Sequence, residues 1–217
     1  MNKCELLNLT IQRLATGGAT PILPPEYQQV EYLQSTGTQY VDTGILLSDN
    51  YERVEVKLNV TSANNRSRYF SSWSDSLNRG AIIAYGTSTN PLGNIYVGST
   101  DYSITNTAIN TDYTIDLTAD NGLLTGSYCG VNVNKSYNGS VVTGYKIGLF
   151  CEFNNQGASG QCTAKIYYFR LHTSAGLQRD YIPCYRKLDN KPGMYDIVND
   201  TFYTNAGTGE FTAGNNV

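Results

Sequence analysis

Residues 164–214 read AKIYYFRLHTSAGLQRDYIPCYRKLDNKPGMYDIVNDTFYTNAGTGEFTAG. The stretch opens with a strand over residues 165–172, in which alternate side chains point to opposite faces. The two expected sets are Tyr167, Phe169 and Leu171 in a core, and Tyr168, Arg170 and His172 on the other face. Pro183 is predicted to keep the next strand out of a central position, because proline has no backbone N–H to donate.

The same alternation recurs earlier in the chain. It places Val54, Val56, Leu58 and Val60 on one face, then Tyr113, Ile115 and Leu117, and then Ile147, Leu149, Cys151 and Phe153 on one central strand over residues 145–153. Residues 120–122, Asp-Asn-Gly, are typical of a hairpin turn. Roughly a dozen short strands with such spacing predict an all-β antiparallel β-sandwich of two sheets over residues 26–217, preceded by a short N-terminal extension.

Three segments carry a resemblance to a known family. They are RDYIPC at 179–184, GMYD at 193–196 with a Gly-rich end, and YLQSTGTQYVDTG at 32–44 as the opening strand. This set resembles a laminin-G-like jelly roll of the concanavalin A-like superfamily, in the version common in bacteriophage structural proteins and gut-bacterial surface proteins. The resemblance covers residues 26–217 and implies the fold. It leaves function open, because one fold hosts many functions.

Composition narrows the range of partners. The 217 residues carry a formal net charge of −3 and no cluster of Lys and Arg, so no nucleic acid partner is expected, because phosphate contacts need a basic patch. No run approaches the roughly 18 apolar residues of a transmembrane helix, so no membrane partner is expected. The N-terminus lacks the features of a signal peptide, which favours synthesis in a bacterial host cytoplasm.

The five cysteines are Cys4, Cys129, Cys151, Cys162 and Cys184. Their odd number and wide spacing are not those of a disulfide framework, and no Cys-x-x-Cys pair indicates zinc. Buried free thiols are predicted, since free cysteine packs as a small hydrophobe. Cys151 and Cys162 flank a loop and could pair in an exported protein. We expect no metal and no cofactor.

The N-terminal segment differs from the rest of the chain. Cys4, Leu7, Ile11 and Leu14 fall at helical spacing and form one apolar stripe, and residues 17–25 follow as a Pro/Gly linker. An isolated helix of this length is marginal in water, so the stripe needs a partner surface. That surface is either the chain's own domain or an assembly partner, namely a capsid or tail protein of a virion or the other chains of a homotrimer.

No catalytic residues are predicted. Glycoside hydrolases need two carboxylates across the scissile bond, and the Glu-x-Asp-x-x-Glu pattern of the laminarinase-like branch is absent. Residues 152–155, EFNN, offer one acid and two amides. His172 is the sole histidine, and no Gly-x-Ser-x-Gly elbow is present for it to serve. We therefore expect that the protein is not an enzyme.

One region has the composition of a sugar site, which combines aromatic rings that pack on pyranose faces with amides and carboxylates that bind hydroxyls. The candidate ligand-binding residues are Trp73, Asp75, Asn78, Tyr85 and Tyr96. The alternative is that these aromatic residues belong to the core or an interface, because aromatic side chains dominate both. The acidic and amide residues of this region lack the spacing of a calcium loop.

Two functions follow from these features. The first is a non-enzymatic bacteriophage structural protein on the virion surface, either a capsid decoration protein or a fibre or tail subunit, which displays its domain to host-surface or mucus glycans. The alternative is a glycan-binding adhesin domain of a gut-bacterial surface protein. The stripe Cys4, Leu7, Ile11 and Leu14 favours the first and the aromatic residues suit both.

Overall fold

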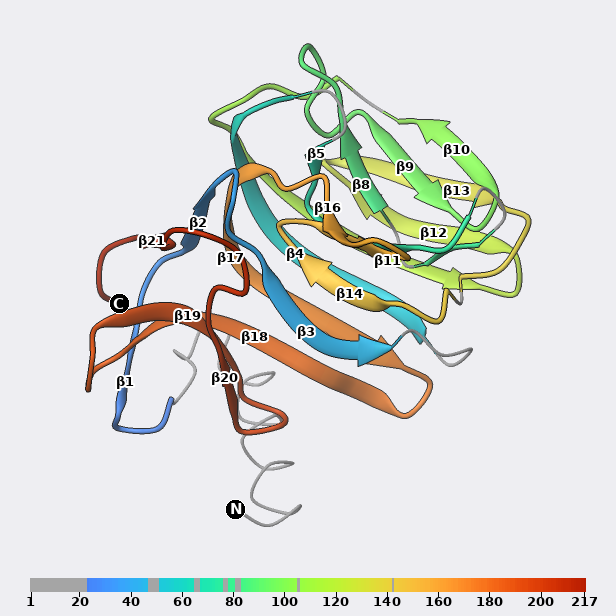
Figure 1. Cartoon of the computed structure of the whole chain (residues 1–217). Helices are drawn as coiled ribbons and strands as arrows, with labels where there is room; N and C mark the ends of the chain where they lie inside the picture. Colours follow the sequence, from blue (N-terminus) through green and yellow to red (C-terminus); the bar gives the residue numbers. More distant parts are fainter. Residues whose placement is uncertain are drawn as a thin grey trace.

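A computed structural model describes residues 23–46, 51–64, 67–75, 78–80, 83–104, 106–141 and 143–217. Within these ranges the regular structure consists of β-strands (Figure 1). The strands are β1 (Tyr27–Gln29), β2 (Leu33–Thr36), β3 (Val41–Leu46), β4 (Tyr51–Ser62), β5 (Ser67–Arg68), β6 (Phe70–Trp73), β7 (Arg79–Gly80), β8 (Ile83–Gly86), β9 (Asn94–Val97), β10 (Thr100–Ser103), β11 (Asp112–Asp120), β12 (Leu123–Tyr128), β13 (Val131–Ser136), β14 (Lys146–Leu149), β15 (Glu152–Asn154), β16 (Gly157–Ser159), β17 (Thr163–Thr173), β18 (Gly176–Arg186), β19 (Lys191–Asp196), β20 (Thr201–Tyr203) and β21 (Thr212–Ala213).

The first layer of the fold is one large sheet of eleven strands. Its order is β13-β12-β11-β4-β17-β18-β19-β20, with β1 paired to β18, β2 paired to β17 and β21 paired to β2. The last strand of the chain therefore joins the same sheet as the first ones, and an isolated bridge between Val30 and Asn216 adds to this closure. Both ends of the described chain lie on the side of the sheet where β1 and β21 are found (Figure 1).

The second layer consists of two smaller sheets. One has the order β16-β15-β6-β14-β3 with β7 beside β6, and the other has the order β10-β9-β8-β5. Both face the large sheet (Figure 1). The Phe70 ring of β6 lies 5.6 Å from the Phe169 ring of β17, and the Tyr128 hydroxyl of β12 donates to the Asn94 carbonyl of β9 at 3.2 Å. The core lies between the layers.

The predicted all-β sandwich is confirmed, but its second layer is two sheets and not one. The reason is a bend at Tyr69, which is fully buried between β5 and β6. Because of the bend, Arg68 pairs with β8 while Phe70 pairs with β14. One further departure from the prediction is that β15 runs parallel to β6. The finer assignment to the laminin-G-like jelly roll stays a prediction.

The strand β4 forms the centre of the large sheet, between β11 and β17. Its inward residues are fully buried, as the alternation predicts: Val54, Val56, Leu58 and Val60. Burial of each side chain of this size contributes about 1.5–3 kcal/mol relative to leaving it exposed. The β11–β12 turn also follows the prediction, because Asn121 and Gly122 both have positive φ, 47° and 76°, as a two-residue hairpin turn requires.

The strand β17 departs from the predicted alternation at one residue. Phe169 and Leu171 are buried, as expected, but Tyr167 is only half-buried. A register shift after Ile166 places Tyr167 in a bulge, so Ile166 takes the inward position and Tyr167 turns outward to donate to Asp112 Oδ1 at 2.8 Å. A bulge inserts one extra residue and reverses the alternation beyond it.

The segment 145–153 is not the single strand that the pattern predicts. It forms β14 and β15, which lie on opposite sides of β6, the first antiparallel to it and the second parallel. The chain reverses at Phe150, whose φ of 65° is in the left-handed region. Ile147, Leu149 and Cys151 are all fully buried, so their pattern fits a continuous strand as well as a reversal.

Pro183 lies inside β18, contrary to the prediction that it would exclude the strand from a central position. The strand β18 pairs with β19 along one side, where Pro183 lies opposite Met194. On its other side, β18 pairs with β17 as far as Tyr181 and with β1 from Cys184 onward. Pro183 lies at this change of neighbour, where its carbonyl accepts a hydrogen bond from Val30 N–H at 3.0 Å.

The predicted anchor residues Cys4, Leu7, Ile11 and Leu14 lie outside the described residues. Four cysteines lie within them, and all four are free thiols: Cys129, Cys151, Cys162 and Cys184. The last three are buried, as predicted, and Cys129 is half-buried. Burial raises the pKa of the Cys184 thiol to about 12, so this sulfur stays protonated and packs as an apolar group.

A Leu58→Ala variant tests the position of the core. Leu58 is fully buried on β4, so removal of its side chain leaves a cavity between the layers. We expect the free energy of unfolding to fall by about 2–5 kcal/mol, measured by urea denaturation. Leu188→Ala is the matched control, because Leu188 is 89% exposed, and it should leave stability within about 0.5 kcal/mol. Equal effects of the two substitutions would contradict this core.

Candidate functional site

A pocket of about 520 Å³ lies in the second layer, where the two smaller sheets meet. This volume is in the range of small-ligand sites. Strands β5, β6 and β9 and the β15–β16 hairpin contribute its walls. The lining residues are Arg68, Trp73, Tyr96, Glu152, Asn154, Gln156, Ser159 and Gly160.

Two aromatic residues from different sheets line this pocket. Trp73 ends β6, and Tyr96 lies in the middle of β9. Along β9 the side chains alternate, so Ile95 and Val97 are fully buried while Tyr96 is half-buried. The Arg68 guanidinium lies 5.7 Å from the centre of the Trp73 ring, a cation–π contact. Both aromatic residues are half-buried, so neither ring is fully enclosed by the core.

A buried ion pair crosses from one small sheet to the other at this pocket. Arg68 Nε of β5 donates to Glu152 Oε2 of β15 at 2.9 Å, with side chains only 7% and 8% exposed. Arg68 N–H also donates to the Gly160 carbonyl at 2.8 Å, and Ser159 Oγ donates to Glu152 Oε1 at 3.3 Å. The ion pair holds the β15–β16 hairpin against β5. Because its two charges are opposite, the pair adds no net charge to the pocket.

The β15–β16 hairpin supplies neutral hydrogen-bonding groups. Asn154 Nδ2 donates to Ser159 Oγ at 2.9 Å, across the hairpin. Asn154 Oδ1 accepts from Gln156 N–H at 2.8 Å, which holds the turn. These contacts orient the Asn154 amide and the Ser159 hydroxyl before any ligand arrives. The pocket thus combines aromatic rings with neutral donors and acceptors.

The structure brings together two of the five sequence-predicted residues, Trp73 and Tyr96. Asp75 and Asn78 lie outside the pocket lining, in the β6–β7 connection. There, Asn78 N–H donates to Asp75 Oδ1 at 3.0 Å and Asn78 Nδ2 donates to Asp75 Oδ2 at 3.0 Å, so they stabilise their own turn. Tyr85 belongs to β8, and its side chain lies outside what the structure describes.

Sequence reasoning missed the polar half of the pocket. Arg68 and Glu152 are 84 residues apart, and no local spacing connects them. The available signal is the polar segment 154–160, which lies in the loop flanked by Cys151 and Cys162. Without the parallel pairing of β15 with β6, this loop could not be placed beside Trp73.

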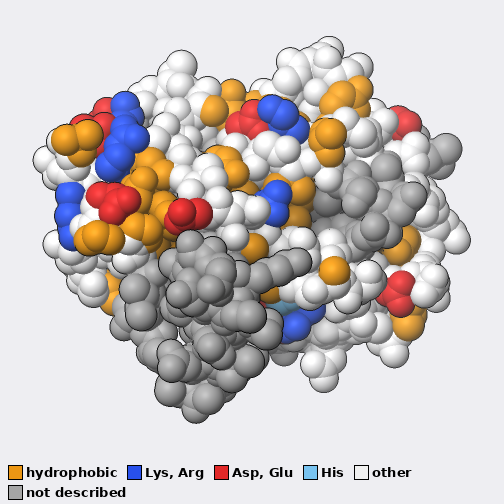
Figure 2. Space-filling view, turned by 90° about the horizontal axis from the view of Figure 1, so that it is seen from below, with side chains coloured by type: hydrophobic (Ala, Val, Ile, Leu, Met, Phe, Trp, Pro, Cys, Tyr) orange, Lys and Arg blue, Asp and Glu red, His pale blue; other side chains and the backbone are white. Residues whose placement is uncertain are grey.

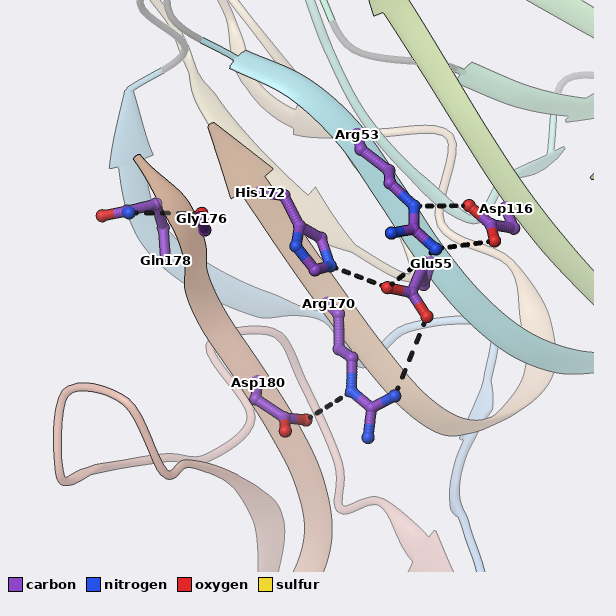
Figure 3. A network of polar contacts seen from close by, with 8 residues as sticks. All are labelled: Arg53, Glu55, Asp116, Arg170, His172, Gly176, Gln178 and Asp180. Carbon is purple, nitrogen blue, oxygen red and sulfur yellow. Dashed lines mark hydrogen bonds and ion pairs between the residues drawn. The ribbon is translucent and has the colours of Figure 1, made fainter. Parts of the chain in front are cut away.

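Elsewhere on the surface, charges are mixed. Seen from below, Lys and Arg side chains lie interspersed with Asp and Glu side chains among the described residues (Figure 2). The outer side of the large sheet carries a connected network of charged side chains, contributed by β4, β11, β17 and β18 (Figure 3). Its charged members are Arg53, Glu55, Asp116, Arg170, His172 and Asp180.

Glu55 is the centre of this network. His172 Nε2 lies 2.7 Å from Glu55 Oε1, and Arg53 Nη2 and Arg170 Nη1 lie 3.3 Å and 3.8 Å from the same carboxylate. The hydrogen bond from His172, followed by the two guanidinium charges, holds the pKa of Glu55 below its ordinary value of 4.5, against the opposing effect of burial. The outward placement of Arg170 and His172 agrees with the predicted face. The cluster combines two guanidinium groups and an imidazole with three carboxylates, as structural ion-pair networks do.

A Glu55→Gln variant tests this network. A lowered pKa in the folded state means that the stabilisation by Glu55 is present above the unfolded-state pKa and is lost as pH falls through the folded-state pKa. We therefore expect wild-type stability to decline more steeply than that of the variant from about pH 5 downward, measured by urea unfolding. Glu26→Gln, at an exposed carboxyl outside the network, should retain the wild-type slope. Parallel curves for wild type and Glu55→Gln would contradict the assignment.

Two further findings concern the described part of the chain. No group of three or more His, Cys, Asp or Glu residues in it could hold a metal ion. It also contains no helix of the length and apolarity needed to cross a membrane.

Comparison with known proteins shows the fold class. No protein-family model matches the chain, and no match was found among curated proteins. A solved structure with a similar fold is a "putative carbohydrate binding protein" from Bacteroides ovatus, with a TM-score of 0.56 and 14% sequence identity. The match covers 86% of this chain but 61% of that one, so this chain spans about three fifths of its neighbour's length. At this identity, the likeness shows the all-β sandwich alone.

Proposed function

We propose that this protein is a non-catalytic glycan-binding domain whose sugar site is the pocket between β5, β6, β9 and the β15–β16 hairpin. The observation that carries the proposal is the convergence of Trp73 and Tyr96 with Asn154, Gln156 and Ser159. A pyranose has an apolar face of C–H groups and a rim of hydroxyls. Aromatic rings offer a rigid apolar surface to the face of C–H groups. Amides and hydroxyls offer hydrogen-bond donors and acceptors to the sugar hydroxyls.

The charge state of the pocket supports a neutral sugar. Arg68 and Glu152 neutralise each other at 2.9 Å, and the remaining lining side chains are uncharged. A few well-placed polar groups in a concave pocket are typical of ligand sites. The name of the Bacteroides ovatus protein, which refers to carbohydrate binding, supports the same class of ligand, although that name applies to the neighbour.

Two biological settings were expected from the sequence. The similarity to a protein of a gut Bacteroides favours the adhesin domain of a gut-bacterial surface protein over the bacteriophage virion protein. The virion role depends on the anchor stripe Cys4, Leu7, Ile11 and Leu14, which lies outside the described residues. That role therefore stays a prediction, and nothing in the described chain favours it.

The proposal excludes hydrolysis on chemical grounds. Glycosidases use two carboxylates, about 5–5.5 Å or about 6.5–9.5 Å apart. Among the described residues that line the pocket, Glu152 is the one carboxylate, and it accepts hydrogen bonds from Arg68 and Ser159. This carboxylate is engaged by two protein donors and has no second carboxylate across the pocket to act with it.

The first test of function is a Trp73→Ala variant. Loss of the ring removes the main apolar surface of the pocket, and truncation of such an anchor costs about 2 kcal/mol or more in binding, or roughly 30-fold in affinity. We expect binding on a glycan array and in calorimetry to fall at least this much. The melting temperature should stay within a few degrees, because Trp73 is half-buried and ends its strand.

The control is Tyr168→Ala. Tyr168 is a half-buried aromatic residue on β17, on the other layer, with Arg170 5.1 Å from its ring centre. This substitution should leave glycan binding unchanged. If Trp73→Ala binds glycans as wild type does, the pocket is not the sugar site. If instead the Trp73→Ala variant loses about 3–5 kcal/mol of stability, Trp73 is a core residue.

The second test concerns catalysis. Incubation of the wild-type protein with the glycans that it binds should release no new reducing ends, because the pocket has a single, ion-paired carboxylate. The measurement is a reducing-sugar assay over many hours. Hydrolysis that disappears in a folded Glu152→Gln variant would contradict the non-catalytic assignment.

A further inference from the structure

A second hollow, of about 430 Å³, lies on the other side of the β15–β16 hairpin. Its walls include Thr38 and Tyr40, which precede β3, Ala158 in β16 and Gln161 after it, and Thr208 in the loop between β20 and β21. Figure 1 shows that loop passing close to the start of β3.

The walls of this second hollow are tightly built. Ala206 N–H donates to the Tyr40 carbonyl at 2.9 Å, and Thr208 N–H donates to the Thr38 carbonyl at 3.2 Å. Between them, Gly207 approaches so closely that a Cβ there would lie 2.1 Å from the Thr38 carbonyl oxygen and 3.0 Å from the Tyr40 ring. Only glycine permits this approach, so the hollow exists before a ligand arrives.

The two hollows share one wall. In and after β16, Ser159 and Gly160 line the first hollow, whereas Ala158 and Gln161 line the second. Ala158 and Ser159 are successive residues of β16, and successive side chains of a strand point to opposite faces, so this strand separates the two hollows. Gly160, which lines the first hollow and carries no side chain, adjoins Gln161, which lines the second, so the chain at this point forms the ridge between the hollows.

The second hollow repeats the chemistry of the first. Tyr40 supplies a half-buried aromatic ring, held edge-on against Phe153 with ring centres 5.8 Å apart. Gln161 supplies a side-chain amide, and Thr38 and Thr208 supply hydroxyls. The first hollow has the same three kinds of group in Trp73 and Tyr96, in Asn154 and Gln156, and in Ser159.

We infer that the second hollow is a further sugar subsite and that the ligand is a chain of several sugar units that crosses the ridge at Gly160. This inference rests on the proposed function of the first hollow. A disaccharide fills one hollow, whereas a longer chain reaches both. The two hollows select for chain length, because the second contributes binding only to a ligand already held by the first.

The experiment is calorimetric titration with cellobiose, mannobiose and xylobiose and with the three matching hexasaccharides. We expect one hexasaccharide to bind at least about 5-fold more tightly than its disaccharide. In Gln161→Ala, which removes one amide from the second hollow, affinity for the hexasaccharide should fall by about 3- to 10-fold, the range for one hydrogen bond. Affinity for the disaccharide should not change.

A matched control is Gln178→Ala. Gln178 Nε2 donates to the Gly176 carbonyl two residues away at 3.3 Å on β18 (Figure 3), as Gln161 Nε2 donates to the Ala158 carbonyl at 3.4 Å. Gln178 is half-buried like Gln161 but lies outside both hollows, so its loss should change neither affinity. Ala158→Leu, which narrows the second hollow, should act as Gln161→Ala does.

The outcomes separate this inference from the proposed function. Equal affinity for disaccharide and hexasaccharide, or a hexasaccharide affinity unchanged in both Gln161→Ala and Ala158→Leu, overturns the second subsite and leaves the first hollow intact. No wild-type binding of any of the six sugars overturns the neutral-glycan site itself. Loss of disaccharide binding in Gln161→Ala also overturns the inference, because the second hollow would then be no separate subsite.

Discussion

The buried Arg68–Glu152 ion pair is the interaction on which the site depends. It joins β5 of one small sheet to β15 of the other at 2.9 Å, with both side chains less than a tenth exposed. Two charges taken out of water gain little net stability, but removal of one partner leaves the other uncompensated, at a cost of about 3–5 kcal/mol. The pair therefore acts as a constraint on geometry, since any arrangement that separates the two sheets at this point is strongly disfavoured.

Two breaks in the chain bring these charges together. The bend at Tyr69 separates β5 from β6, and the reversal at Phe150 separates β14 from β15. The breaks lie side by side, because Phe150 N–H donates to the Tyr69 carbonyl at 2.8 Å. A positive φ at a bulky residue costs about 1–3 kcal/mol. Phe150 is fully buried with its ring centre 5.2 Å from that of Phe211, so packing offsets this strain.

Sequence patterns predict the large sheet well and the site poorly, for a physical reason. Alternation reports which face of a strand is buried, so Val54 to Val60 could be placed from sequence. It does not report where a strand reverses or bulges, so Phe150 and Tyr167 were misplaced. Trp73 and Tyr96 could be proposed from residue type alone. Their partner Asn154 could not, because its position depends on a parallel pairing between strands about 80 residues apart.

The main core and the proposed sugar site thus lie largely in different layers. The large sheet contributes the central buried residues of β4 and β17, and the hollows are lined by short strands and connections of the second layer, apart from the terminal loop at 206–208. Side chains on the β15–β16 hairpin, such as Gln156, can change without disturbing the core. The same hairpin borders both hollows, so under the proposed function one short segment determines what each hollow accepts and how the two are connected. Ligand specificity in this fold is therefore expected to vary with the hairpin, while the sandwich beneath it stays the same.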